Sequence, residues 1–128
     1  MTNTAKKNIF IVDDDVLFAK MLSNCVSKNG QNTVRLFTTG EACLEALSEN
    51  PDIIILDFYL NSVSKNAADG SQILETIKKR NSGIHVIMLS SQESYGTALK
   101  TIIKGAEQYV IKSKDAIDEI ENIIKKLN

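Results

Sequence analysis

The sequence has 128 residues, of which 43% are hydrophobic and 24% charged, and its 15 lysines and arginines against 16 acidic residues leave a net charge of -1. This length predicts one domain, residues 1–128, with a hydrophobic core of its own. A nearly neutral chain has no overall attraction for a polyanion, which argues against direct binding of nucleic acid. Its apolar runs are too short to cross a bilayer or to form a signal peptide, so we expect a cytoplasmic protein without membrane contact.

Short apolar runs alternate with longer amphipathic stretches along the chain. Runs rich in Ile and Val are typical of strands buried on both faces. In the longer stretches, apolar residues recur at the spacing of one helix face. In chain order the sequence predicts a strand at 9–12, a helix at 15–29, a more mixed strand at 33–37, a helix at 40–49, a strand at 53–56, a helix at 71–80, a strand at 86–89, a helix at 93–104, a strand at 109–111 and a helix at 114–127.

Turn residues follow the first four predicted helices. Gly30 suits the left-handed position that ends a helix, and Pro51 cannot continue the helix before it. Gly83 and Gly105 follow the third and fourth helices. Five repeats of strand and helix predict an α/β fold, with a parallel sheet covered by helices on both faces.

The two cysteines lie among apolar residues of the predicted helices. Cys25 and Cys43 do not have the spacing of a Cys-x-x-Cys metal or redox motif. We therefore expect two reduced, buried side chains without a chemical function.

Acidic, hydroxyl and amino side chains directly follow the predicted strands. In an open parallel sheet, ligands bind beyond the carboxyl ends of the strands, so these residues carry most of the information about function. The first strand is followed by Asp13, Asp14 and Asp15, the third by Asp57, the fourth by Ser90 and Ser91, and the fifth by Lys112.

The acidic residues predict a site for a divalent cation. Asp13, Asp14 and Asp57 would converge if the first and third strands are neighbours. Close carboxylates repel one another, and their pKa values rise unless a cation joins them. Mg²⁺ suits such a site because it prefers one or two carboxylates, several waters and a phosphoryl oxygen. The alternative is that the consecutive acids only cap the next helix, which is the role we expect for Asp15.

Asp57 also has the setting of a nucleophile, because a buried strand would hold its carboxylate rigidly. A carboxylate can attack phosphorus and form an acyl phosphate. This transfer depends mainly on positioning and on neutralised phosphoryl oxygens. Lys112 can neutralise one oxygen as a compact charge, and Ser90 can donate a hydrogen bond to another. Each of these two would be ordinary alone, but together with the acids they predict phosphoryl transfer.

This ordered set resembles the receiver domain family of bacterial two-component response regulators. The family has an acidic pair after strand one, Asp at the end of strand three, Ser or Thr after strand four and Lys after strand five. The matching segments are Val12-Asp13-Asp14, Leu56-Asp57, Leu89-Ser90 and Tyr109-Val110-Ile111-Lys112. The resemblance covers essentially the whole chain. It implies a flavodoxin-like, doubly wound (βα)5 three-layer sandwich with strand order 2-1-3-4-5.

The resemblance implies a phosphoacceptor and its metal ligands. Asp57 would accept a phosphoryl group from the phosphohistidine of a sensor histidine kinase or a histidine phosphotransfer protein. Asp14, Asp57 and the backbone carbonyl of Tyr59 would bind Mg²⁺ directly, and Asp13 would bind it through water.

The resemblance also implies a switch rather than an enzyme with turnover. Lys112 and Ser90 would hold phosphoryl oxygens, and Tyr109 occupies the position of the switch aromatic residue. Phosphorylation would draw Ser90 toward the phosphate and Tyr109 inward, so that a partner meets a changed surface. We expect that partner to be an effector protein or a linked output domain, and the face made by the fourth helix, fifth strand and fifth helix would allow a homodimer.

Two features depart from the family pattern. Receivers usually have Pro four positions and Gly eight positions after the phosphoacceptor, whereas here Asn61 replaces the Pro and the equivalent glycine is Gly70. The loop at 58–69 is therefore five residues longer, and it either shields the acyl phosphate, recognises the partner or is a tolerated surface insertion. Lys112 is followed by Ser113 instead of a cis-linked Pro, so we expect either a cis bond, which costs roughly 3 kcal/mol, or a slightly repositioned lysine.

Three other functions compete with this one. The acids at 13–15 are similar to the Asp-x-Asp start of haloacid dehalogenase-like phosphatases, which would make Asp13 the nucleophile of an enzyme. However, Leu17 stands where that class has Thr or Val. A receiver-like module that works without phosphate would not need the full set of acids. A flavin-binding protein is disfavoured because three acids would repel the cofactor phosphate.

Overall fold

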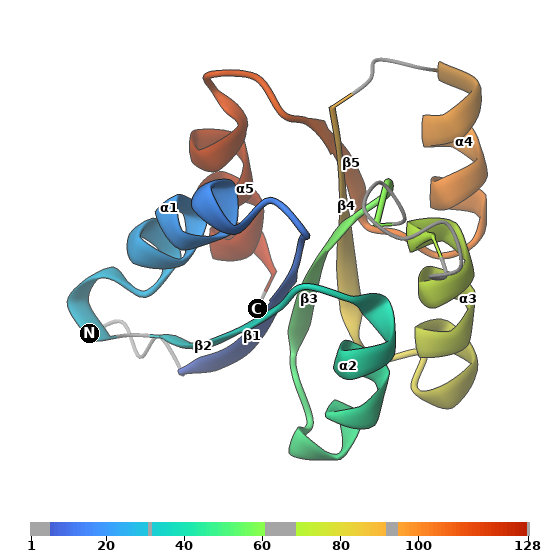
Figure 1. Ribbon diagram of the computed structural model, residues 1–128, viewed down its shortest axis with the longest axis horizontal. Helices are drawn as coiled ribbons and strands as arrows, with labels where there is room; N and C mark the ends of the chain where they lie inside the picture. The colour runs from blue at the N-terminus through green and yellow to red at the C-terminus, as the bar shows by residue number, and fades with distance from the viewer. Residues whose placement is uncertain (1–5, 31, 61–68, 92–94, 128) are drawn as a thin grey trace.

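The computed structural model describes residues 6–30, 32–60, 69–91 and 95–127, which form a sheet with helices on both of its faces (Figure 1). The strands are β1 (Lys7–Val12), β2 (Asn32–Phe37), β3 (Ile53–Asp57), β4 (His85–Ser90) and β5 (Gln108–Ile111). They are all parallel and lie in the order β2-β1-β3-β4-β5. The predicted strand order is therefore confirmed, and β1 and β3 are neighbours.

The helices complete a three-layer sandwich, as predicted. They are α1 (Val16–Val26), α2 (Gly40–Glu45), α3 (Gly70–Arg80), α4 (Tyr95–Ile103) and α5 (Ala116–Lys126), with short 3₁₀ turns η1 (Lys28–Gly30) and η2 (Leu47–Glu49). Helices α1 and α5 cover one face of the sheet, and α2, α3 and α4 lie on the other (Figure 1). The predicted helices at 15–29 and 40–49 are thus each an α-helix followed by a 3₁₀ turn.

Alternating residues of the central strands fill two separate hydrophobic clusters, one on each face of the sheet. In β3, Ile54 and Leu56 belong to the cluster beneath α2 and α3, whereas Ile53 and Ile55 belong to the cluster beneath α1 and α5. All five residues of β3 are buried, as the apolar run predicted for a central strand. The edge strand β2 is more exposed, which explains its mixed sequence.

Side-chain caps determine where several helices begin. Asp15 accepts a hydrogen bond from the Phe18 amide at 3.2 Å and starts α1, so the predicted capping role of Asp15 is confirmed. Asp69 and Gln72 form a reciprocal capping box at the start of α3. The positive φ of Gly30, 65°, agrees with the predicted helix end.

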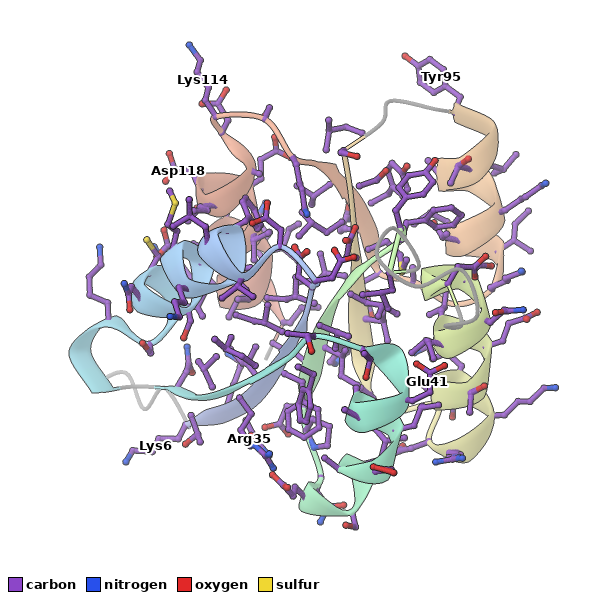
Figure 2. All side chains as sticks on the ribbon, in the orientation of Figure 1. Lys6, Arg35, Glu41, Tyr95, Lys114 and Asp118 are labelled. Atoms are coloured by element: carbon purple, nitrogen blue, oxygen red, sulfur yellow. The ribbon has the colours of Figure 1, made fainter. Side chains whose placement is uncertain are left out.

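Helix α4 leaves most of its apolar side chains uncovered. The only buried side chain of α4 is that of Thr101. Leu99, Ile102 and Ile103 are 61%, 42% and 74% exposed. Figure 2 shows Tyr95 projecting away from the rest of the molecule at the start of α4. Helix α4 thus presents an apolar face to solvent.

The prediction for the cysteines was correct for one of the two. Cys43 is buried and Cys25 is only half-buried, and both are free thiols. Burial raises the pKa of the Cys43 thiol to about 12, so this side chain stays protonated and unreactive. None of the described helices has the length and apolar character needed to cross a membrane.

Candidate functional site

The carboxyl edge of the sheet brings together side chains from four strand ends. Asp13 follows β1, Asp57 is the last residue of the neighbouring β3, Ser90 ends β4, and Lys112 follows β5. The amide of Lys112 donates a hydrogen bond to the Ser90 carbonyl oxygen at 2.7 Å, which ties the end of β5 to the end of β4. The predicted meeting of these residues is therefore present in the fold.

Three carboxylates form a compact acidic cluster. One oxygen from each of Asp13, Asp14 and Asp57 lies within 4.8 Å of the other two. Asp13 and Asp57 are 1% and 4% exposed, and Asp14 is half-buried. Asp13 Oδ1 accepts a hydrogen bond from the Asp15 amide at 2.9 Å, and Asp57 Oδ1 accepts one from the Tyr59 amide at 3.3 Å. The backbone therefore holds both buried carboxylates in place.

Lys112 supplies the positive charge next to this cluster. Its Nζ lies 2.9 Å from Asp13 Oδ2 and donates a hydrogen bond to Asp13 Oδ1 at 3.1 Å. The same Nζ lies 3.7 Å from Asp57 Oδ2, and the lysine side chain is 14% exposed. One ammonium group is thus shared between two buried carboxylates.

The pKa values reflect this shared charge. Burial, together with the negative charge of Asp13, raises the pKa of Asp57 to about 7, although Lys112 and the Tyr59 amide act in the opposite direction. Burial acts to lower the pKa of Lys112. Its hydrogen bond to Asp13 and the nearby charges, chiefly that of Asp57, outweigh this effect and raise that pKa above its ordinary value. Lys112 therefore stays charged, but it does not balance the acids around it.

The acidic cluster fits a hard divalent cation. Three carboxylates and one ammonium group leave a formal charge of -2 when all are ionised. Asp13 Oδ2 is buried and lies 2.9 Å from the Lys112 ammonium nitrogen, but in a geometry that is not a hydrogen bond. A buried carboxylate oxygen without a well-directed donor gains from a further positive group. Oxygen ligands of this kind are those that Mg²⁺ prefers.

The two predicted switch residues, Ser90 and Tyr109, lie on the neighbouring strands β4 and β5. Ser90 is fully buried at the end of β4, and Tyr109 is half-buried on β5 against the cluster beneath α2 and α3. Tyr59 is half-buried two residues after Asp57. Its amide binds Asp57, whereas the metal-binding role of its carbonyl oxygen stays a prediction.

Gly70 is the expected equivalent of the glycine in the family pattern, and it stands five positions later because the loop is longer. A Cβ atom at this position would overlap the Asp57 carbonyl oxygen and lie 2.6 Å from Phe58 Cα. The Gly70 amide donates a hydrogen bond to the Phe58 carbonyl oxygen at 2.8 Å. The start of α3 therefore packs directly against the end of β3. Most of the longer loop, residues 61–68, lies outside the described residues.

The bond between Lys112 and Ser113 is trans, because the described part of the chain contains no cis peptide. The alternative of a cis bond to Ser113 was therefore wrong. The Ser113 amide donates a hydrogen bond to the Ile111 carbonyl oxygen at 2.7 Å, which makes a tight turn directly after β5. The lysine reaches Asp13 from this turn.

Phe18 contacts the site although the sequence indicated only a core position for it. The Lys112 Nζ lies 5.0 Å from the centroid of the Phe18 ring. Nothing in the spacing of helix 15–29 distinguishes this residue from its apolar neighbours. Only the fold shows that the first turn of α1 lies beside the lysine.

A hollow of about 700 Å³ lies elsewhere, at the amino ends of the strands. Its lining includes Lys7, Asp52 and His85. It contains none of the predicted site residues, and phosphoryl transfer needs fixed charges rather than a large cavity. The shallow acidic cluster at the carboxyl edge is therefore the candidate site.

The fold and this cluster define an α/β domain of the phosphoacceptor type, and comparison with known proteins agrees. The family model described as response regulator receiver domain matches residues 9–125. The chain therefore belongs to the receiver domain family of two-component response regulators, which are phosphoacceptor signalling domains.

Relatives include free-standing and larger proteins. The chemotaxis protein CheY of Bacillus subtilis is 28% identical over 121 residues, which are 94% of this chain and 97% of CheY. The transcriptional regulatory protein ZraR of Escherichia coli K12 is 30% identical over 119 residues, 93% of this chain but 26% of ZraR. The probable transcriptional regulatory protein TcrX of Mycobacterium tuberculosis is 25% identical over 104 residues, 81% of this chain and 42% of TcrX. The chain thus spans nearly all of CheY and less than half of the two transcriptional regulators.

Solved structures show the same similarity. The BeF3-activated receiver domain of DrrB is 26% identical with a TM-score of 0.83, and the match covers 95% of this chain and 97% of that one. A CheY-like receiver domain protein from Methanospirillum hungatei JF-1 is also 26% identical, with a TM-score of 0.80 and coverage of 96% and 94%.

Proposed function

We propose that Asp57 is the phosphoacceptor of this receiver domain, and that Asp13, Asp14 and Asp57 hold Mg²⁺ during the transfer. The observation that carries this proposal is the meeting of three carboxylates from β1 and β3 with the ammonium group of Lys112. We expect the backbone carbonyl of Tyr59 to complete the protein ligands, and Asp13 to act through water. When bound, Mg²⁺ would supply positive charge to the transferred phosphoryl oxygens.

The transfer itself uses the residues of the chain in distinct roles. An oxygen of Asp57 attacks the phosphorus of a donor in line with the leaving group, so that a new P–O bond forms as the bond from phosphorus to the donor breaks. For a phosphohistidine donor, the leaving imidazole nitrogen takes up the electron pair. Lys112 stabilises charge on one phosphoryl oxygen, and the Ser90 hydroxyl donates a hydrogen bond to another.

We expect the phosphorylated state to differ from the free state at two side chains on the neighbouring strands β4 and β5. Ser90 would move toward the phosphate, and Tyr109 would follow from its half-buried position. This shifts an equilibrium between two surfaces instead of creating a new fold. The domain would therefore act as a switch, without turnover of a substrate beyond its own phosphorylation and dephosphorylation.

The partners follow from this role. The donor is a sensor histidine kinase or a histidine phosphotransfer protein, and the output is an effector protein or a linked output domain. Helix α4 exposes Leu99 and Ile103 beside β5, which supports an interaction surface over α4, β5 and α5. A homodimer through this face is one form of output. The longer loop at 58–69 would act as a shield for the acyl phosphate or as a contact for the partner, unless it is only a tolerated surface insertion.

Intact-mass spectrometry tests the proposal directly. The wild-type chain, Asp57→Ala and the exposed-site control Asp52→Asn are incubated with acetyl phosphate and Mg²⁺. One phosphoryl group should appear on the wild type and the control, and none on Asp57→Ala or on wild type with EDTA. Equal phosphorylation of Asp57→Ala would refute the role of Asp57. Turnover of a phosphate ester that is lost in Asp13→Asn but kept in Asp57→Asn would instead establish an enzyme with Asp13 as nucleophile.

A further inference from the structure

An aromatic ring lies against the ammonium group that serves the phosphoryl-transfer site. The Lys112 Nζ is 5.0 Å from the centroid of the Phe18 ring, inside the distance of about 6 Å at which a cation is attracted by a π face. The same nitrogen contacts both carboxylate oxygens of Asp13, at 2.9 and 3.1 Å. The ammonium group is thus held by two different kinds of contact, one ionic and one aromatic.

The Phe18 ring is itself well fixed. Phe18 lies in the first turn of α1, where its amide donates a hydrogen bond to the capping Asp15 carboxylate at 3.2 Å. Its half-buried side chain packs against the hydrophobic cluster beneath α1 and α5. The first turn of α1, which follows the acidic residues at 13–15, therefore holds the Phe18 ring in position.

The lysine needs such a restraint because its contacts must change during the transfer. In the structure its Nζ is closer to Asp13, at 2.9 Å, than to Asp57, at 3.7 Å. To stabilise a phosphoryl group on Asp57, the ammonium group must turn from Asp13 toward the new oxygens. A lysine side chain is long and flexible, so ordering it costs free energy. A π face attracts the charge without directed hydrogen bonds, and it can therefore keep Nζ close during this turn.

We propose that Phe18 is a positioning residue for phosphoryl transfer, whose ring keeps the Lys112 ammonium group beside Asp57. This inference rests on the proposed roles of Asp57 and Lys112. Phe18 is not one of the proposed metal ligands or phosphoryl contacts, and it acts only through the lysine. Its loss should therefore slow the transfer without weakening the binding of Mg²⁺.

The test compares the full chain with Phe18→Leu and Phe18→Tyr. Leucine keeps apolar contact with the cluster but has no π face, whereas tyrosine keeps the ring. At saturating Mg²⁺, the initial rate of Asp57 phosphorylation by acetyl phosphate should fall roughly three- to tenfold in Phe18→Leu. Phe18→Tyr should stay within about twofold of the wild type, and the apparent Mg²⁺ affinity from thermal denaturation should stay within about twofold in both variants.

Two further variants separate positioning from a general loss of stability. Ile123→Ala removes a half-buried side chain from the same cluster, in the last part of α5. It should lower stability and leave the rate of phosphorylation unchanged. In a Lys112→Met background, Phe18→Leu should have no further effect on the rate, because the ring then has no charge to hold.

The outcomes distinguish this inference from the proposal on which it rests. A wild type that is phosphorylated on Asp57 and a Phe18→Leu variant that is equally fast would overturn the role of Phe18 alone. The role of Phe18 would also be overturned if Phe18→Tyr lost rate to the same extent, if the rate loss persisted in the Lys112→Met background, or if it came with weaker Mg²⁺ binding. A wild type that takes no phosphoryl group on Asp57 would refute the proposed function, and the inference with it.

Discussion

Replacing Asp57 with asparagine should stabilise the metal-free protein, and the gain should grow with pH. The carboxylate is buried beside Asp13 and is only partly balanced by Lys112 at 3.7 Å. Asparagine has nearly the same shape and keeps an oxygen that can accept the hydrogen bond from the Tyr59 amide. The substitution therefore removes an unfavourable charge and little else.

The sign and size of the effect follow from proton linkage. The pKa of Asp57 rises from the ordinary value of 3.8 to about 7 in the folded chain. Between these values the folded state keeps a proton that the unfolded chain has released, so stability falls as the pH rises from about 4 to about 7. The loss is absent below this window and complete above it. Since the side chain is only 5% exposed, the difference corresponds to at most about 4 kcal/mol.

Urea denaturation in EDTA, at several pH values between 5 and 8, measures this gain. The free energy of unfolding of Asp57→Asn should exceed that of the wild type by the largest margin at pH 8 and by a much smaller margin at pH 5. Asp118→Asn serves as a control, because this carboxylate is exposed in the first turn of α5. That control should lose a few tenths of a kcal/mol at most. An Asp57→Asn variant that is less stable than the wild type, or whose gain does not depend on pH, would refute the electrostatic reasoning.

Three other predictions follow from the site and its supports. Mg²⁺ should stabilise the wild type, by about 2.7 kcal/mol at a hundredfold excess over its dissociation constant, and the shift in melting temperature should be smaller in Asp13→Asn; an equal shift would remove Asp13 from the metal site. Gly70→Ala should lower the free energy of unfolding by roughly 2 kcal/mol or more in urea denaturation, because the new Cβ meets the backbone of Asp57 and Phe58. The control Gly96→Ala, whose Cβ would meet no atom of the described residues within 4 Å, should be neutral or slightly stabilising. The Lys104 Nζ, directly after α4, donates a hydrogen bond to Ser71 Oγ at 2.8 Å and lies 3.5 Å from Glu75, both on α3. Lys104→Met should therefore speed hydrogen exchange in α4 while lowering global stability by less than about 1 kcal/mol. Unchanged exchange would show that this contact does not hold α4.

Much of the fold could be predicted because apolar pattern and burial agree in the central strands. The Ile-rich run at 53–56 is buried on both faces in β3, and the spacing of Ile73, Leu74 and Ile77 is that of the buried face of α3. The site could be predicted for a topological reason. Parallel strands end at one edge of the sheet, so the residues that follow them meet there whatever the details of the helices.

Two features could not be decided from the sequence because they depend on what lies opposite a side chain. The apolar spacing of α4 is the same as that of a core helix, yet Leu99 and Ile103 face solvent. Periodicity shows that a helix has an apolar face, but not that another element of the same chain covers it. Likewise, Phe18 has the spacing of a core residue, and its contact with Lys112 arises only when α1 and the end of β5 come together.

The imbalance of charge at the carboxyl edge connects stability to function. Three carboxylates share one ammonium group, which is an unfavourable arrangement for a folded chain without metal. A second lysine would relieve this repulsion, but it would also remove the affinity for a dication. On the proposed function, the domain gives up this part of its folding stability for the binding of Mg²⁺. For this reason, Asp57→Asn should stabilise the metal-free domain and at the same time remove its response to phosphorylation.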